Sequence, residues 1–434
     1  MSLLEPEIEA APWERQGVDD DAPYRRQLAY LLERSRFYRA KLTDAGFASP
    51  AAAGGLADIA KLPFTEKDEL RASRSADEPI GTHATAAPAD IVRIYSTSGT
   101  TGTPSYIPLT AADLEVWVRT SSRSYAASGL QRGDRLVSTY NAGPFVAGAT
   151  LDAFARLGLC VIPVGSGNTD RLIGAVERLR PSVVALTPSY ALHLAEWAES
   201  RGIDLAKSSV KRLMVAGEPG GGEPALRAKL EAAWGARVTE AMGIGDISPS
   251  LWGECEAKAG MHFSGRGFVH FELIDPASGA IVPMRDGAEG ELVLTHLLNR
   301  SAPLLRFRTR DHVRLGVGLC ACGRTAPRVR CIGRTDDMLI VRGVNLFPTA
   351  LREIVAEFAP AVTGVVMIRP KAAGVRQEPP LPVAVEALDP TQSELADRIR
   401  ARVREALLVT TEITLVAASA LPRSDYKSKL VERK

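Results

Sequence analysis

Residues 95–104 read Tyr-Ser-Thr-Ser-Gly-Thr-Thr-Gly-Thr-Pro, a segment made mostly of hydroxyl side chains with two glycines. It directly follows the β-branched run 91–94, which predicts a strand. Glycines let the backbone approach an anion closely, and hydroxyl and backbone N–H groups supply hydrogen-bond donors. The spacing differs from a Walker A loop, and no Lys-Ser/Thr pair follows the second glycine. The segment therefore predicts a phosphate-binding loop, although a flexible surface loop has a similar composition.

The chain around this loop alternates between β-branched runs and helical periodicity. The runs 161–164, 183–186 and 212–215 predict strands, and the apolar spacing over 23–46 predicts one helix. This alternation predicts an α/β fold in which helices cover the sheets of a large N-terminal domain. Residues 268–332 have strand-like runs with Gly and Pro between them, which indicates a β-rich subdomain. The remainder predicts a small mobile α+β C-terminal lid, so we divide the chain into 1–335 and 336–434.

The overall composition is that of an ordinary globular protein. Of the 434 residues, 45% are hydrophobic and 24% are charged, and the net charge is +2. So small a charge argues against a nucleic-acid partner. No apolar run reaches the ~18 residues that span a bilayer. The acidic N-terminus shows no secretory signal, so we expect a cytoplasmic protein that does not bind membranes.

Several motifs together resemble one enzyme family. Ser98-Gly99-Thr100-Thr101-Gly102-Thr103-Pro104 resembles the signature loop of the acyl-adenylate-forming enzymes, and the segment 62–71 (Leu-Pro-Phe-Thr-Glu-Lys-Asp-Glu-Leu-Arg) resembles their phenylacetate–CoA ligase branch. The resemblance continues in the family's order along nearly the whole chain, through segments 165–169, 187–190, 217–219, 306–311, 333–338, 342–348 and 422–427. Several motifs in one order are more specific than any single motif.

The resemblance implies an ATP site. Its residues are Thr97, Ser98, Gly99, Thr100, Thr101, Gly102, Gly217, Glu218, Pro219, Met242, Gly243, Asp246, Asp311 and Arg334. In the family, the aspartate at the place of Asp311 binds the ribose hydroxyls; a salt bridge to a nearby Arg is the alternative. Asp246 is the candidate Mg²⁺ ligand. The chain departs from the family pattern at Thr103 (usually Lys), Met242 (Tyr), Gly245 (Thr or Ser) and Asp246 (Glu).

Two further residues receive catalytic roles from the resemblance. Lys427 would stabilise charge in the adenylation transition state, although Lys429 competes for that role and a tail lysine is usually solvated. Asp336 would be the hinge of the lid, whereas a cap or turn is the structural alternative. Both assignments rest on the position of these residues within the family's motifs.

The acyl pocket is implied by residues 141–149. Asn141, Phe145, Ala147 and Gly148 are the candidate substrate-binding residues. Phe145 equally suits the core. Small residues here leave room for a ring, so a planar aromatic or heteroaromatic acid is expected.

Three of the five cysteines lie close together in the sequence. Cys255, His262, Cys320 and Cys322 offer three thiolates and one imidazole, a common ligand set for structural zinc. Reduced cysteines in packed turns are the alternative, and Cys331 is a substitute ligand. Cys160 lies in an apolar run and is expected in the core.

These observations predict an AMP-forming acid–CoA ligase. ATP and Mg²⁺ would activate an aryl or arylacetic acid to an acyl-adenylate, and coenzyme A would then take the acyl group. One alternative passes the acyl group to a carrier protein or another acceptor. A second alternative is a degenerate nucleotide-binding relative without turnover. Family members are often dimers, so a homodimer is also considered.

Overall fold

The computed structural model describes residues 3–97, 105–140, 146–165, 167–372, 374–422 and 429–432. It divides into two compact units. Unit 1 comprises Met1–Gly165, Thr239–Thr309 and Arg314–Arg330, and unit 2 comprises Ser166–Val238, Arg310–Val313 and Cys331–Lys434. Among the described residues, no helix is both long and apolar enough to cross a bilayer.

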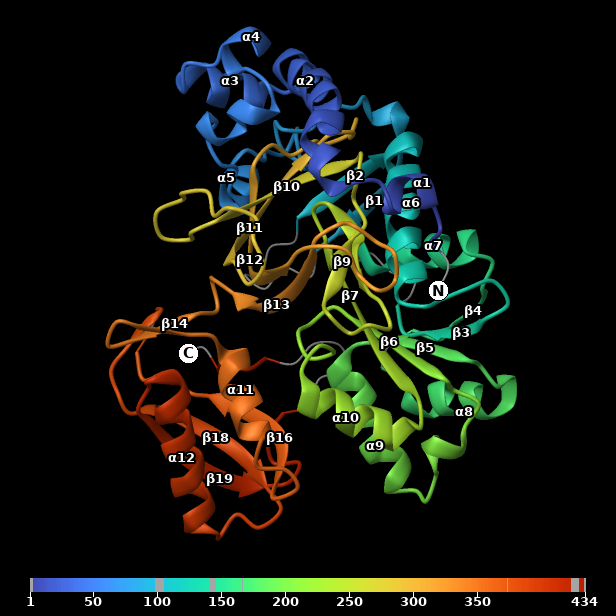
Figure 1. Ribbon diagram of the computed structural model, residues 1–434, viewed down its shortest axis with the longest axis vertical. Coiled ribbons are helices and arrows are strands. Elements are labelled where there is room, and N and C mark those ends of the chain that lie inside the picture. The colour runs from blue at the N-terminus through green and yellow to red at the C-terminus, as the bar shows by residue number, and fades with distance from the viewer. Residues whose placement is uncertain are drawn as a thin grey trace. The chain divides into compact units, whose positions relative to one another are not determined.

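Unit 1 begins with helices, the first of which are drawn in blue in Figure 1. Its helices are α1 Pro6–Glu9, α2 Gln16–Arg34, α3 Arg36–Asp44, α4 Pro50–Ala53, α5 Lys67–Ala72, α6 Ala111–Ala127 and α7 Thr150–Arg156. Apolar side chains of α2 and α3 form one buried cluster. The prediction of a single helix over 23–46 is wrong, because two helices meet at Ser35. Its hydroxyl accepts a hydrogen bond from the Tyr38 N–H (3.2 Å) and caps α3.

The strands of unit 1 form a mixed sheet and a separate hairpin. They are β1 Ile91–Ser96, β2 Tyr106–Thr110, β3 Arg135–Ser138, β4 Cys160–Pro163, β7 Arg237–Ile244, β8 Ser248–Glu254, β9 Met261–Phe263, β10 Val269–Ile274, β11 Glu289–His296, β12 Phe307–Gly316 and β13 Arg328–Arg334. Strands β1 and β2 pair antiparallel on their own. The neighbours in the sheet run β10-β11-β12-β13-β9-β8-β7, and β3 pairs parallel with β4.

Helix α6 packs closely on β8. A Cβ at Gly253 of β8 would lie 2.0 Å from the Ser124 carbonyl oxygen of α6, so only glycine fits there. The hydroxyls of Ser124 and Ser250 hydrogen-bond at 2.6 Å across the same contact. Small residues therefore set the spacing between this helix and the sheet.

Unit 2 contains a parallel strand pair and a smaller α+β body. Its elements are β5 Val183–Leu186, β6 Arg212–Ala216, α8 Thr169–Leu179, α9 Pro188–Glu199, α10 Pro224–Trp234, β14 Leu339–Val341, β15 Val344–Leu346, α11 Pro348–Ala356, β16 Val362–Ile368, β17 Arg376–Gln377, β18 Leu381–Ala387, α12 Ser393–Leu407 and β19 Thr411–Ala417. Helices α11 and α12 lie against the sheet β16-β18-β19, shown in orange and red in Figure 1. The predicted α/β class, with an α+β C-terminal part, is confirmed.

Cys160 does not lie in the core, so that prediction is wrong. The residue is exposed, and β4 is the last strand of its sheet. A strand with a neighbour on one edge alone leaves more of its surface uncovered. An apolar run predicts a strand equally well in the middle and at the edge of a sheet, and this explains the error.

Candidate functional site

The ends of the predicted phosphate loop are held together in unit 1. The Ser105 N–H donates to the Thr97 hydroxyl (3.2 Å), and the Thr97 N–H donates to the Ser105 carbonyl (3.0 Å). These bonds extend the β1–β2 hairpin by one pair. The predicted loop residues Ser98, Gly99, Thr100, Thr101 and Gly102 lie outside the described residues. The hairpin therefore fixes where the chain enters and leaves the loop.

The turn after β7 lies against this hairpin. A Cβ at Gly245 would lie 3.3 Å from Thr97 Cγ2 and 3.5 Å from Val146 Cγ2. The departure to glycine at this position thus has a steric reason, because a side chain would press on Thr97. Gly243 has another such reason, since a Cβ there would lie 2.0 Å from the Pro249 carbonyl oxygen. The β7–β8 register shifts between Met242 and Ile244 at the same place.

Asp246 follows this turn and forms an ion pair with Lys67. The distance from Lys67 Nζ to Asp246 Oδ2 is 2.8 Å, with the two side chains 31% and 11% exposed. Lys67 is the first residue of α5 and lies within the segment 62–71 that resembles the family. The sequence interpretation used that segment only to identify the branch and missed Lys67 as a site residue. The sequence offered one clue to this role, the lysine in the family-like segment, but its partner Asp246 lies 179 positions away.

Arg306 fixes the segment that carries Lys67. Its buried guanidinium makes two hydrogen bonds with Glu272 (2.9 and 3.1 Å) and donates to the Leu62 carbonyl (2.6 Å). It also lies over the Phe64 ring, with 4.1 Å between the guanidinium carbon and the ring centroid. The Thr65 hydroxyl donates to the Leu305 carbonyl (2.6 Å). The N-cap of α5 is Glu66, whose N–H donates to Glu69 (2.7 Å).

We expect Arg306→Met to destabilise unit 1 by about 3–5 kcal/mol, because Glu272 would remain buried without its charge partner. Urea denaturation would measure the change. Arg314→Met is the matched control, since its ion pair with Glu289 is exposed (57% and 41%) and such pairs contribute about 0–1 kcal/mol. Equal losses in the two variants would contradict a special role for the buried pair.

The predicted acyl-pocket residues are only partly described. Ala147 and Gly148 lie in the short 3₁₀ turn Val146–Ala149, where Gly148 is buried. The Thr150 hydroxyl donates to the Ala147 carbonyl (2.7 Å) and fixes this turn. Asn141 and Phe145 lie outside the described residues. Val146 in this turn faces Gly245. The turn therefore lies beside Asp246, a predicted ATP-site residue.

In unit 2, Arg334 connects two of the predicted residues. It donates to both carboxylate oxygens of Asp336 (2.9 and 2.8 Å), and its Nη1 lies 3.3 Å from Asp311 Oδ1. Burial lowers the pKa of Arg334, but the charge of Asp311 and the bond to Asp336 outweigh this and raise it. Arg334 is thus the nearby arginine that the salt-bridge alternative for Asp311 names, and ribose binding by Asp311 stays a prediction. It also joins the predicted ribose ligand to the predicted hinge residue.

Glu218 has a structural partner in unit 2. Its Oε1 accepts a hydrogen bond from the Ser189 N–H (2.8 Å) at the start of α9. Gly217 adopts a positive φ of 97°, and the Pro219 carbonyl accepts a bond from Arg352 Nη2 (2.9 Å). Arg352 also pairs with Glu223 (3.1 Å from Nε), so it supports the turn 217–219. The sequence interpretation missed Arg352, because its partner lies 129 positions away.

The two candidate catalytic lysines are described unequally. Lys427 lies outside the described residues, whereas Lys429 is described and exposed. Their ranking therefore stays a prediction.

Cys255, His262, Cys320 and Cys322 come together in unit 1. Their ligand atoms all lie within 4.8 Å of one another. Cys255 Sγ is 3.7 Å from Cys320 Sγ, and Cys322 Sγ is 3.4 Å from His262 Nε2. In a tetrahedral zinc site with Zn–S bonds of ~2.3 Å, two sulfurs are roughly 3.8 Å apart, and a sulfur and an imidazole nitrogen about 3.6 Å. The distances thus fit zinc. Cys331 is not in this group, and its Sγ faces the Gly333 carbonyl (4.0 Å).

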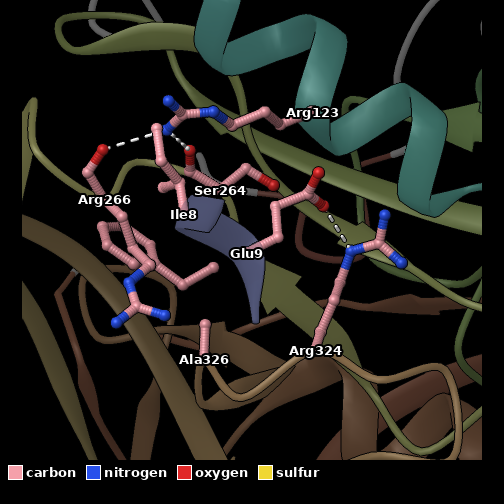
Figure 2. A pocket seen from close by; sticks show the side chains of 8 residues that line it. Ile8, Glu9, Arg123, Ser264, Arg266, Arg324 and Ala326 are labelled. Atoms are coloured by element: carbon pink, nitrogen blue, oxygen red, sulfur yellow. Dashed lines mark hydrogen bonds and ion pairs between the residues drawn. The ribbon is translucent and has the colours of Figure 1, made fainter. Parts of the chain in front are cut away.

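Neighbouring groups orient the four candidate ligands. His262 Nδ1 lies 3.4 Å from the Ala326 carbonyl, which leaves Nε2 facing the cluster. Hydrogen bonds from Cys255, and then from His262, lower the pKa of the Cys322 thiol. Arg324 Nη1 lies 3.7 Å from Cys322 Sγ, while its Nε donates to Glu9 of α1 (2.7 Å). Figure 2 shows this ion pair beside Arg123 and Arg266. The cluster is therefore connected to the N-terminal segment.

Comparisons with known proteins place the chain in one enzyme family. Residues 41–297 match the AMP-binding enzyme model, and residues 343–433 match the AMP-binding enzyme C-terminal domain. The phenylacetate–coenzyme A ligase of Thermus thermophilus is 34% identical over 98% of this chain and 97% of its own length. The phenylacetate–coenzyme A ligase of Aromatoleum evansii is 37% identical over 76% of this chain and 72% of its own.

A solved structure agrees as well. A 2-hydroxyisobutyryl-CoA ligase in the postadenylation state, in complex with R3-HIB-AMP, has a TM-score of 0.89 and 27% identity. It covers 99% of this chain, which covers 92% of it. The chain therefore belongs to the AMP-binding enzyme family, in its phenylacetate–coenzyme A ligase branch.

Proposed function

We propose that this chain is an AMP-forming ligase that joins an aryl or arylacetic acid to coenzyme A. Family membership and the relatives support two half-reactions: acid and ATP give an acyl-adenylate and pyrophosphate, and the CoA thiol then displaces AMP. The observation that carries the proposal is the meeting of Thr97, Gly245 and the Asp246–Lys67 pair at the base of the predicted phosphate loop. The small residues Ala147 and Gly148 support a ring-sized acid.

The residues of the site divide the work of adenylation. The phosphate loop binds the β- and γ-phosphates, and Lys427 stabilises the charge that develops at the α-phosphate. Asp246 fits Mg²⁺, because this ion takes one or two carboxylates and completes its shell with phosphate oxygens and water. When bound, Mg²⁺ would neutralise phosphate charge. Lys67 holds one oxygen of Asp246 and orients the other. Asp311 would bind the ribose after separating from Arg334, and Asp336 would be the hinge between the half-reactions.

Pyrophosphate release tests the proposal directly. The enzyme would be incubated with ATP, Mg²⁺ and a panel of aryl, arylacetic and short aliphatic acids, with and without CoA. We expect acid-dependent pyrophosphate, followed by acyl-CoA when CoA is present. Pyrophosphate without acyl-CoA would instead favour a carrier-protein thiol or another acceptor. ATP binding without turnover for any acid would favour the degenerate nucleotide-binding alternative.

Lys67→Met should slow adenylation by about tenfold, the effect of losing one hydrogen bond to a charged group. The loss should appear mainly as a higher requirement for Mg²⁺, since Asp246 loses the cation that orients it. Pyrophosphate release against Mg²⁺ concentration measures this. Lys61→Met is the control, because Lys61 is exposed (68%) and pairs with the nearby Asp58. An unchanged Mg²⁺ dependence in Lys67→Met would exclude the orienting role.

We also propose that Cys255, His262, Cys320 and Cys322 bind a structural zinc ion. Four candidate ligands leave no open position for a substrate, and closed sites of this kind stabilise structure. Arg324 would orient Cys322 as a neighbour of the ligand shell. A homodimer also remains a proposal of the resemblance, and light scattering coupled to gel filtration would test it.

A further inference from the structure

A second pocket lies beside Asp246 in unit 1. Its polar lining comes from Arg74, His83, Ser105 and Asp246, with Tyr106 next to them. None of the candidate roles above uses Arg74 or His83. Ser105 bonds to Thr97, so the pocket opens at the described end of the phosphate-loop hairpin. The lining thus joins Asp246, the candidate Mg²⁺ ligand, to Ser105, the first described residue after the loop.

Arg74 brings positive charge to this pocket. Its guanidinium lies over the Tyr106 ring, 5.8 Å from the centroid. Burial, and then the nearby charge of Arg71, lower the pKa of Arg74, and this outweighs the opposite effect of Tyr106 and Asp246. An anion in the pocket would reverse this balance, because it would stabilise the charged guanidinium. Asp246 offers little compensation, since Lys67 already pairs with it.

His83 adds a neutral hydrogen-bonding group. The side chain is 6% exposed, and burial lowers its pKa to about 4, so the ring is neutral near pH 7. Its Nδ1 has no hydrogen-bond partner among the described residues. The ring lies edge-on to Phe37, with 6.4 Å between the centroids. A buried nitrogen without a partner is costly unless a ligand or water satisfies it.

The phosphate loop itself contains no cation. Segment 95–104 has neither Lys nor Arg, although the bound polyphosphate would carry several negative charges. Hydroxyl and N–H donors do not neutralise that charge. Two described cations lie beside Asp246: Lys67 pairs with it, and Arg74 lines the same pocket.

We infer that this pocket receives the pyrophosphate end of ATP, and that Arg74 supplies the positive charge that the phosphate loop lacks. The inference rests on the proposed function. When the carboxylate attacks the α-phosphorus, the bond from that phosphorus to the bridging oxygen breaks, and pyrophosphate leaves with the electron pair. Arg74 stabilises the charge of this leaving group, and His83 hydrogen-bonds to one of its oxygens.

The reverse half-reaction isolates this role. Acyl-adenylate and pyrophosphate would be supplied, and ATP formation measured. We expect Arg74→Met to raise the KM for pyrophosphate about 10- to 100-fold, the effect of one charged hydrogen bond or ion pair. Thioester formation from supplied acyl-adenylate and CoA should be unchanged, since no pyrophosphate takes part. Arg71→Met is the control, because Arg71 pairs with Asp68 and does not line the pocket.

A compensating variant sharpens the test. Thr103→Lys, added to Arg74→Met, should restore at least part of the affinity for pyrophosphate by placing a cation in the loop. Arg74→Lys keeps the charge and should lose less than Arg74→Met, which also guards against a folding defect. An unchanged pyrophosphate KM in Arg74→Met would overturn the inference while leaving the ligase intact. A wild-type enzyme without turnover would refute the proposed function instead. Calorimetric titration of pyrophosphate into wild type and Arg74→Met would then decide the binding site.

Discussion

Replacing Lys427 by alanine should lower the rate of acid-dependent pyrophosphate release by about 10²–10³-fold, the usual effect of losing one group that stabilises developing charge. The lysine is needed only while the α-phosphate carries the extra charge of the transition state. Thioester formation from supplied acyl-adenylate and CoA should therefore stay within about twofold of the wild type. Rapid quench measurements of the two half-reactions would separate these effects.

Lys429→Ala is the matched control for this prediction. Lys429 lies two positions further along the same tail and is exposed, so its removal changes the same net charge. We expect it to leave adenylation nearly unchanged. If Lys429→Ala lost the adenylation rate and Lys427→Ala kept it, the assignment by motif position would be wrong. Equal slowing of the two half-reactions by Lys427→Ala would point to a loss of substrate binding.

Removing the proposed zinc ion from the cysteine–histidine cluster should lower stability about as much as Arg306→Met does. A ligand that binds only the folded state, present at a thousand times its Kd, stabilises that state by about 4 kcal/mol. Cys255→Ser, which alters a fully buried ligand, should therefore lower the melting temperature and release the metal. Metal analysis would measure the stoichiometry, and cobalt substitution would give thiolate charge-transfer bands from Cys255, Cys320 and Cys322.

Two other cysteines serve as controls. Cys331 lies in unit 2 and Cys160 is exposed, and neither belongs to the cluster. Cys331→Ser and Cys160→Ser should keep the metal and the melting temperature. A purified enzyme without metal, whose stability does not respond to added zinc, would favour reduced thiols in packed turns. Arg324→Gln should speed metal release without removing a ligand, because Arg324 contacts Cys322 Sγ.

Local patterns predicted much of the fold. The strand-like runs at 183–186 and 212–215 correspond to β5 and β6, because a short stretch of consecutive apolar residues suits a buried parallel strand. The same reasoning failed where the structure of a segment depends on residues or strands outside its local pattern. Periodicity continues across Ser35, although its hydroxyl caps a new helix. Cys160 has the sequence of a buried strand, but β4 has a partner on one edge alone.

The site divides in the same way. The cysteine–histidine cluster could be predicted because thiolate and imidazole ligands have few other reasons to occur together. The Lys67–Asp246 and Arg352–Glu223 pairs could not, because nothing in one segment specifies a partner more than a hundred positions away. Gly245 was seen in the sequence as a departure from Thr or Ser, and its close contact with Thr97 became visible in the structure. The sequence thus shows which residues could bind a metal or a phosphate. It does not show which distant residues pair in the folded protein.

The discontinuous composition of unit 1 has a consequence for protein synthesis. Its last stretch, Arg314–Arg330, contains Cys320 and Cys322, whereas Cys255 and His262 are translated earlier. Cys322 follows His262 by 60 positions, so the ribosome needs roughly 3–12 s to make the second pair available. During that interval the nascent chain has only half of its ligand set. Capture of the proposed zinc ion would therefore be a late event in biogenesis, after Cys320 and Cys322 have been made.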